Sequence, residues 1–159
     1  MQHPVLWIHG EALGPANPAL QTFPDRPAVF VFDTELLGGR SPTSSDPANT
    51  LGEPVSLKRI GFLYECLLEL PVTLRRGDVA AEVLAFAQRH GADGVVTSEA
   101  TDPRFSRIAE RIAAGLPLEV LPVPPFIPDG DGQAFDLGRF GRYWRRAAPL
   151  VWQAWQAEP

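Results

Sequence analysis

The sequence predicts a three-layer α/β/α sandwich of Rossmann-like type, built around a five-stranded parallel sheet with the strand order 3-2-1-4-5. Short apolar runs alternate along the chain with helical segments of about ten to fifteen residues, which is the pattern of repeated strand–helix–strand units. The runs are apolar at consecutive positions, as in strands covered on both faces. A chain of 159 residues can bury one such core.

The first two strands are predicted over residues 5–8 and 28–32, where apolar residues follow one another without a break. Between them Asn17 is placed to cap a short helix that begins at Pro18. Residues 38–54 are rich in Gly, Ser, Pro and Thr and predict an exposed, mobile loop.

From Pro54 the apolar pattern takes a helical period and predicts a helix that ends before Pro71. Apolar residues recur there three and four apart, so we expect them to form one buried face, with Cys66 as a small buried hydrophobe beside them. That face comprises Leu57, Ile60, Leu63, Tyr64, Leu67 and Leu68.

The second half of the chain continues the alternation. Strands are predicted over residues 72–74, 94–97 and 118–123. Asp78 is expected to cap one helix and Asp102 the next, which Pro103 opens.

The organisation predicted is an α/β domain over residues 1–135 and a helical tail over residues 136–159 that packs on it. The tail interleaves aromatic residues with arginines, and Pro149 is expected to interrupt its helical spacing. Trp152 and Trp155 follow that proline, so we expect them to contact a partner protein.

Composition limits the function classes. The formal net charge of −5 and the pI of about 5.1 argue against strong direct binding to DNA. Cys66 is the single cysteine, so no intramolecular disulfide is possible. The N-terminus does not resemble a signal peptide and no apolar run has membrane-spanning length. We therefore expect a cytoplasmic protein without a membrane partner.

Ligands of such sheets bind at the carboxyl ends of the strands, near the switch in strand order. Several segments at and between these ends resemble, in order along the chain, the N-terminal α/β domain of the DNA photolyase and cryptochrome family. The matching segments are Val5-Leu6-Trp7, Asn17-Pro18-Ala19-Leu20, Val31-Phe32-Asp33, Gly77-Asp78, His90-Gly91-Ala92-Asp93, Thr101-Asp102-Pro103 and Phe140-Gly141-Arg142-Tyr143-Trp144-Arg145.

The first loop departs from the family pattern. Relatives carry Arg-Arg-Asp-Leu-Arg there, and those arginines help to tie the α/β domain to a flavin-binding helical domain. This chain has His9-Gly10-Glu11-Ala12-Leu13-Gly14 instead. The departure is what we expect of a chain without that helical domain, or of one that docks on a separately encoded flavin-domain protein differently.

The resemblance implies a role in light-dependent DNA repair or blue-light sensing. The family's flavin and lesion contacts lie outside the matched region, so we expect no catalytic residue, no flavin adenine dinucleotide and no repair by this chain alone. It also implies a site for an antenna chromophore: a folate, a deazaflavin or flavin mononucleotide. The positions that match its lining are His9, Gly10, Phe32, Asp33, Thr34, Leu37 and Asp102.

Structural roles compete with these ligand roles. Asp33 at a strand end is more often a turn residue, and Asp102 before Pro103 is a good helix cap. His9 is expected to be an ordinary solvated loop histidine, and a metal site is not expected.

Three functions remain open. The first is an accessory domain that binds an antenna-type chromophore or another aromatic nucleotide and acts with a separate flavin-domain protein. The second is a non-catalytic interaction module without a ligand, assembling with such a protein or with a second copy. The third is a nucleotide-binding protein of the universal-stress or electron-transfer-flavoprotein kind, which is weakest because the chain lacks a Gly-rich phosphate loop.

Overall fold

The computed structural model describes residues 1–38, 55–125, 127 and 135–157. The chain divides into two compact units, Met1–Val123 and Pro124–Pro159. Except for Gly38, the loop predicted over residues 38–54 lies outside the described residues.

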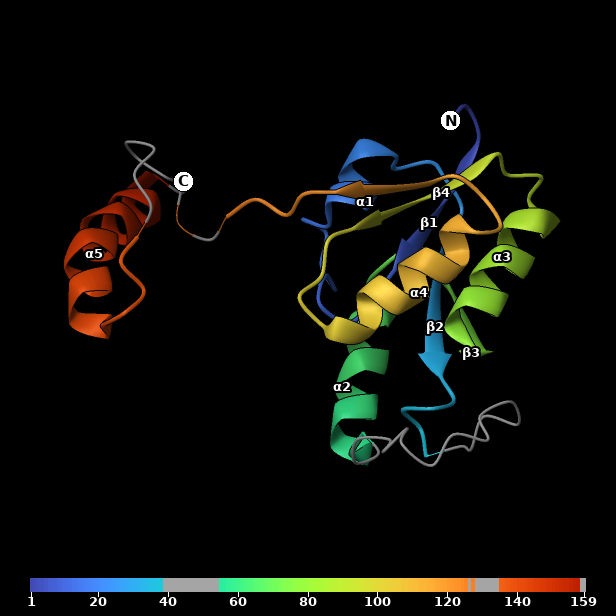
Figure 1. Ribbon diagram of the computed structural model, residues 1–159, viewed down its shortest axis with the longest axis horizontal. Coiled ribbons are helices and arrows are strands. Elements are labelled where there is room, and N and C mark those ends of the chain that lie inside the picture. The colour runs from blue at the N-terminus through green and yellow to red at the C-terminus, as the bar shows by residue number, and fades with distance from the viewer. Residues whose placement is uncertain (39–54, 126, 128–134, 158–159) are drawn as a thin grey trace. The chain divides into compact units, whose positions relative to one another are not determined.

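The first unit contains the predicted sheet (Figure 1). Five parallel strands lie in the order β3-β2-β1-β4-β5, which confirms the predicted fold class and strand order. The strands are β1 (Pro4–Ile8), β2 (Ala28–Asp33), β3 (Val72–Gly77), β4 (Gly94–Ser98) and β5 (Leu118–Leu121). The helices of this unit are α1 (Pro18–Thr22), α2 (Leu57–Leu68), α3 (Val79–Arg89) and α4 (Pro103–Ala113).

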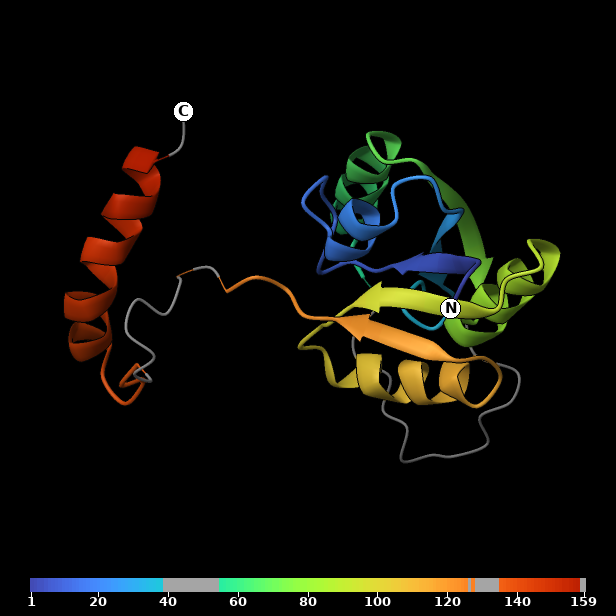
Figure 2. The same ribbon diagram turned by 90° about the horizontal axis from the view of Figure 1, so that it is seen from above.

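Helices cover both faces of the sheet (Figure 2). Alternate strand residues point to opposite faces, so β1 contributes Val5 and Trp7 to one core and Leu6 and Ile8 to the other. The first core lies against α3 and α4, and the second lies against α1 and α2. This arrangement follows from the chain order, because the connections change direction after β3 and therefore change face.

The helix caps are those that the sequence predicts. The Asn17 side chain accepts hydrogen bonds from the backbone of Ala19 and Leu20, Asp78 accepts one from Ala81, and Asp102 accepts one from Arg104. Helix α3 ends at Arg89, and Gly91 follows with a φ of 59°, a left-handed conformation that glycine adopts without steric cost.

The apolar face predicted for α2 is only partly buried. Leu67 is buried and Ile60 and Leu63 are half-buried, whereas Leu57 and Leu68 are 85% and 65% exposed. Tyr64 is also exposed, and Cys66 is half-buried. The predicted residues span more of the helix circumference than one sheet can cover, so the prediction of a single buried face was wrong for the outer residues.

The second unit contains α5 (Phe140–Ala157), and the predicted interruption at Pro149 was wrong. Proline removes one backbone hydrogen bond from a helix interior and normally kinks or breaks it. Pro149 is exposed on the same side as Arg142 and Arg145, where water can satisfy the freed carbonyl. None of the helices in the described part of the chain combines the length and apolarity needed to cross a membrane.

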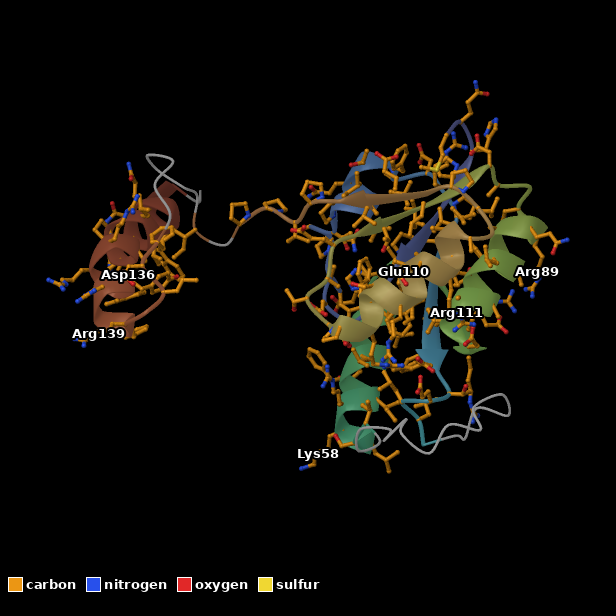
Figure 3. All side chains as sticks on the ribbon, in the orientation of Figure 1. Lys58, Arg89, Glu110, Arg111, Asp136 and Arg139 are labelled. Atoms are coloured by element: carbon orange, nitrogen blue, oxygen red, sulfur yellow. The ribbon has the colours of Figure 1, made fainter. Side chains whose placement is uncertain are left out.

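Helices α3 and α4 are joined by an ion pair at the start of α3. Arg111 of α4 donates hydrogen bonds of 2.8 and 2.9 Å to the Asp78 carboxylate, which also caps α3. Figure 3 labels Arg111 on α4. The hydrogen bond from Arg111 lowers the pKa of Asp78.

Replacing Asp78 by alanine should lower the free energy of unfolding by about 1–2 kcal/mol at neutral pH, most of it from the lost cap. Because the pKa of Asp78 is lowered in the folded chain, its ionised carboxylate stabilises the fold at pH values above the unfolded pKa of about 3.9. This stabilisation is lost as the pH falls through the folded pKa. The Asp78→Ala chain should therefore lose less stability on acidification, as measured by urea unfolding. The control is Glu110→Ala on the exposed side of α4. An equal loss of unfolding free energy in both variants at neutral pH would contradict the prediction.

Candidate functional site

A cavity of about 260 Å³ lies at the carboxyl ends of β1 and β2, beside the switch in strand order between β1 and β4. Its floor comes from the ends of the two strands, one wall from α2 and the other from the start of α4. Its most polar positions come from the segments that follow β1, β2 and β4. The strand-end lining includes Trp7, His9, Gly10, Glu11, Phe30, Phe32 and Asp33, and the helix lining includes Arg59, Ile60, Leu63, Arg104, Phe105 and Ile108.

Aromatic rings form much of the lining. Trp7 and Phe105 stack with ring centroids 5.3 Å apart and an angle of 9° between their planes. The His9 ring meets both of them edge to face. On the other side of the sheet, Phe30 and Phe32 pack edge to face at 5.0 Å. Aromatic rings from both sides of the sheet therefore line the cavity, and each packs against another ring.

His9 is held by the neighbouring strand rather than by solvent. Its Nε2 lies 2.9 Å from the carbonyl oxygen of Ser98, which can only accept, so Nε2 carries the proton. Nδ1 accepts a hydrogen bond from the backbone N–H of Glu11 at 3.3 Å. Burial lowers the pKa of His9, so the ring is neutral at pH 7. The expectation of a solvated loop histidine was wrong, because the loop folds back over the end of β4.

Glu11 ties the loop after β1 to the segment before α4. Its carboxylate accepts hydrogen bonds from the backbone N–H groups of Thr101 and Asp102, both at 2.9 Å, and from the Thr101 hydroxyl at 2.8 Å. The hydrogen bond from the Thr101 backbone is the largest cause of the lowered pKa of Glu11. An internal carboxylate therefore occupies the N–H groups at this end of α4.

Arg104 lies between two carboxylates at the end of β2. Its Nη2 donates to Asp33 and lies 3.3 Å from Glu35, with the Arg104 and Asp33 side chains 22% and 11% exposed. The other oxygen of Asp33 accepts a hydrogen bond from the Glu35 backbone. The Arg104 charge is thus neutralised within the site, and the turn role expected of Asp33 is confirmed.

Six of the seven sequence-predicted site residues line this one cavity: His9, Gly10, Phe32, Asp33, Leu37 and Asp102. Thr34 does not line it; its backbone N–H continues the pairing with β3 by donating to the Gly77 carbonyl. Asp102 caps α4 and also lines the cavity, so its two proposed roles are compatible.

Sequence reasoning missed Trp7, Glu11 and Arg104 as site residues. Trp7 was assigned to the strand core. Arg104 carried a usable signal, because a basic residue in the first turn of a helix faces the unfavourable end of the helix dipole and needs a nearby carboxylate.

The polar groups do not form a nucleophilic centre. The Ser98 hydroxyl lies 3.1 Å from His9 Nε2, but Ser98 is fully buried and Nε2 already donates to a carbonyl. A serine nucleophile must reach its substrate and needs a free acceptor nitrogen on the histidine. Among residues that the structure describes, no group of three His, Cys, Asp or Glu side chains is placed to hold a metal ion.

No known protein-family model matches the chain, and no curated protein is significantly similar to it. The similarity to the photolyase and cryptochrome family therefore stays a prediction based on the segments quoted above.

The hydrogen bonds from Thr101 and Asp102 to Glu11 can be tested by amide hydrogen exchange. Replacing Glu11 by alanine removes the acceptor of the Thr101 and Asp102 N–H groups, so both amides should exchange faster while those of β1 and β4 keep their protection. Glu110→Ala, which removes an exposed carboxylate from α4, is the matched control. Unchanged exchange at Thr101 and Asp102 in the Glu11 variant would show that these hydrogen bonds to Glu11 are absent in solution.

Proposed function

We propose that this chain is a chromophore-binding accessory domain of the photolyase type, which holds one planar heteroaromatic ring system and works with a separate flavin-domain protein. The observation that supports the proposal best is the coincidence of six predicted chromophore contacts in one cavity at the switch point of the sheet. These residues come from segments far apart in the sequence.

The chemistry of the cavity suits a flat, largely uncharged ring. Apolar and aromatic side chains dominate the lining, with a small number of carboxylates that can fix an orientation. Asp33 and Asp102 already accept hydrogen bonds, but a carboxylate has about four acceptor positions, so each keeps capacity for a ligand N–H group.

The size of the cavity limits the ligand. A volume of about 260 Å³ lies just below the range of roughly 300–1,000 Å³ for small-molecule sites. It suits one fused ring system better than a complete dinucleotide. This supports a folate-type pterin, a deazaflavin or a flavin ring over flavin adenine dinucleotide.

A ligand-free interaction module is the second candidate, and the exposed Leu57 and Leu68 on α2 favour it. The absorbance spectrum of freshly purified protein separates the two. A band at wavelengths beyond the aromatic region, lost on denaturation and filtration, supports the chromophore. No band, together with no binding of added pterins, riboflavin or deazaflavin, contradicts it.

Truncating Phe32 tests ring stacking. We expect Phe32→Ala to weaken binding of riboflavin by about 0.5–1.5 kcal/mol beyond the loss of contact area, because a flat ring would stack on this side chain. Phe62→Ala on α2 is the matched control, since Phe62 is 62% exposed and does not line the cavity. Fluorescence titration measures both affinities, and an equal effect of the two truncations would place the ligand elsewhere.

The charges around the cavity predict discrimination against phosphate. Glu11, Asp33 and Asp102 outnumber Arg59 and Arg104 in the lining. Arg104 is neutralised, and Glu11 occupies the N–H groups before α4 that could otherwise hold an anion.

We therefore expect flavin mononucleotide to bind more weakly than riboflavin, by roughly fivefold. Asp102→Asn should reduce this difference, because asparagine keeps the helix cap while removing a negative charge. Calorimetric titration of both ligands against both proteins measures it. Tighter binding of the phosphorylated ligand, unchanged in Asp102→Asn, would show that a cation in the site dominates.

A further inference from the structure

Helix α5 has an aromatic side and a cationic side. At 3.6 residues per turn, Phe140, Trp144, Val151 and Trp155 fall on one side of the helix, and Trp152 lies at its border. The opposite side carries arginine, glutamine and Pro149, and the helix contains no Asp or Glu. This distribution differs sharply from the acidic composition of the whole chain.

Among the described residues of its unit, much of the aromatic side of α5 is exposed. Phe140, Trp152 and Trp155 are 74%, 58% and 72% exposed, and Phe140 stacks on Trp144 along the surface of the helix. Contacts inside the unit lie elsewhere: Phe135 packs against Tyr143, and Ala147 is buried. An exposed apolar patch of this kind marks a binding surface.

Arginines occupy the polar side of the helix, opposite this patch. Arg142 pairs with Asp136 at 3.1 Å, just before the helix, and Arg145 donates to the Gly141 carbonyl within it. Arg139, which Figure 3 labels beside Asp136, adds another exposed cation at the same end. Long arginine side chains can lie along an apolar surface while keeping their charge in water.

We propose that α5 is an interfacial helix that binds the surface of an anionic lipid bilayer, lying in the plane of the membrane with its aromatic side in the headgroup region. Tryptophan favours that region because its ring is apolar while its N–H finds polar partners. A helix with arginines on the polar side and Trp and Phe on the other is typical of interfacial binding, and anionic headgroups complement the arginines. The sequence-based expectation of no membrane partner considered only spanning segments and net charge.

Protein and nucleic-acid occupants fit the helix less well. Two α5 helices packed through their aromatic sides would leave the arginines without an opposite charge, because the helix carries no carboxylate to pair with them. A single-stranded nucleic acid needs a groove that tracks its backbone, whereas α5 presents a convex surface. An anionic bilayer surface can take up the aromatic side chains in its headgroup region and pair its anionic headgroups with the arginines.

The experiment uses the full chain with vesicles of phosphatidylcholine alone or mixed with phosphatidylglycerol. Co-sedimentation measures binding, and tryptophan emission reports insertion, because Trp144, Trp152 and Trp155 lie on α5 whereas Trp7 is buried in β1. We expect binding to the mixed vesicles only, with a blue shift in emission and loss of binding as salt is raised.

Two double variants test the two sides of the helix. Trp152→Ala with Trp155→Ala should weaken binding at least about tenfold. Arg142→Gln with Arg145→Gln should weaken it about thirtyfold at low salt. Phe62→Ala with Tyr64→Ala on α2, and Arg89→Gln with Arg107→Gln on α3 and α4, are matched controls that should bind as the unaltered chain does.

Four outcomes would overturn the proposal. They are no binding to either vesicle, equal binding to neutral vesicles, loss of binding in the control variants as large as in the α5 variants, and a dimer in sedimentation that the tryptophan variant dissociates without any vesicle binding. The last result would assign the aromatic side to a second copy of the chain. Riboflavin titration of the α5 variants keeps this test separate from the cavity, whose lining residues all belong to the first unit.

Discussion

Strand β1 lies at the centre of the sheet, paired with β2 on one edge and β4 on the other, and all five of its residues are buried. A strand that is apolar on both sides must be covered on both sides, so it requires helices above and below the sheet. Apart from the buried Thr97 and Ser98 of β4, it also leaves polar groups little place within the sheet interior. They gather where β1 ends, and His9 and Glu11 are the first residues there that can carry chemistry.

The site is therefore a consequence of how β1 ends. His9 donates to the end of β4, and Glu11 holds the segment before α4, so the loop after β1 crosses the switch point and is fixed on its far side. Arg104 then lies over the end of β2, where Asp33 and Glu35 neutralise it. His9, Glu11 and Arg104 are thus each paired with another element, and aromatic rings line much of the space between them.

The sequence was sufficient for features that depend on local chemistry. The parallel sheet covered by helices follows from alternation and handedness, and the caps at Asn17, Asp78 and Asp102 follow from side chains that bond to backbone two or three residues ahead. The sequence was insufficient where a side chain interacts with a residue far away along the chain. Arg104 and Asp33 are 71 residues apart, and periodicity cannot reveal such a pair. For α2 the apolar residues were correct, but their burial depends on how much sheet lies beneath the helix.

The net charge of −5 conceals an uneven distribution of charge, and the unevenness has functional consequences. Carboxylates predominate around the cavity, whereas α5 carries arginines and no acid. Exposed charges interact over about 8–10 Å at physiological ionic strength, so a surface that meets α5 responds to its arginines and not to the total. The cavity is governed by the same rule, since a ligand there responds to Glu11, Asp33 and Asp102. One chain can thus disfavour an anion at its cavity and attract an anionic surface to its helix.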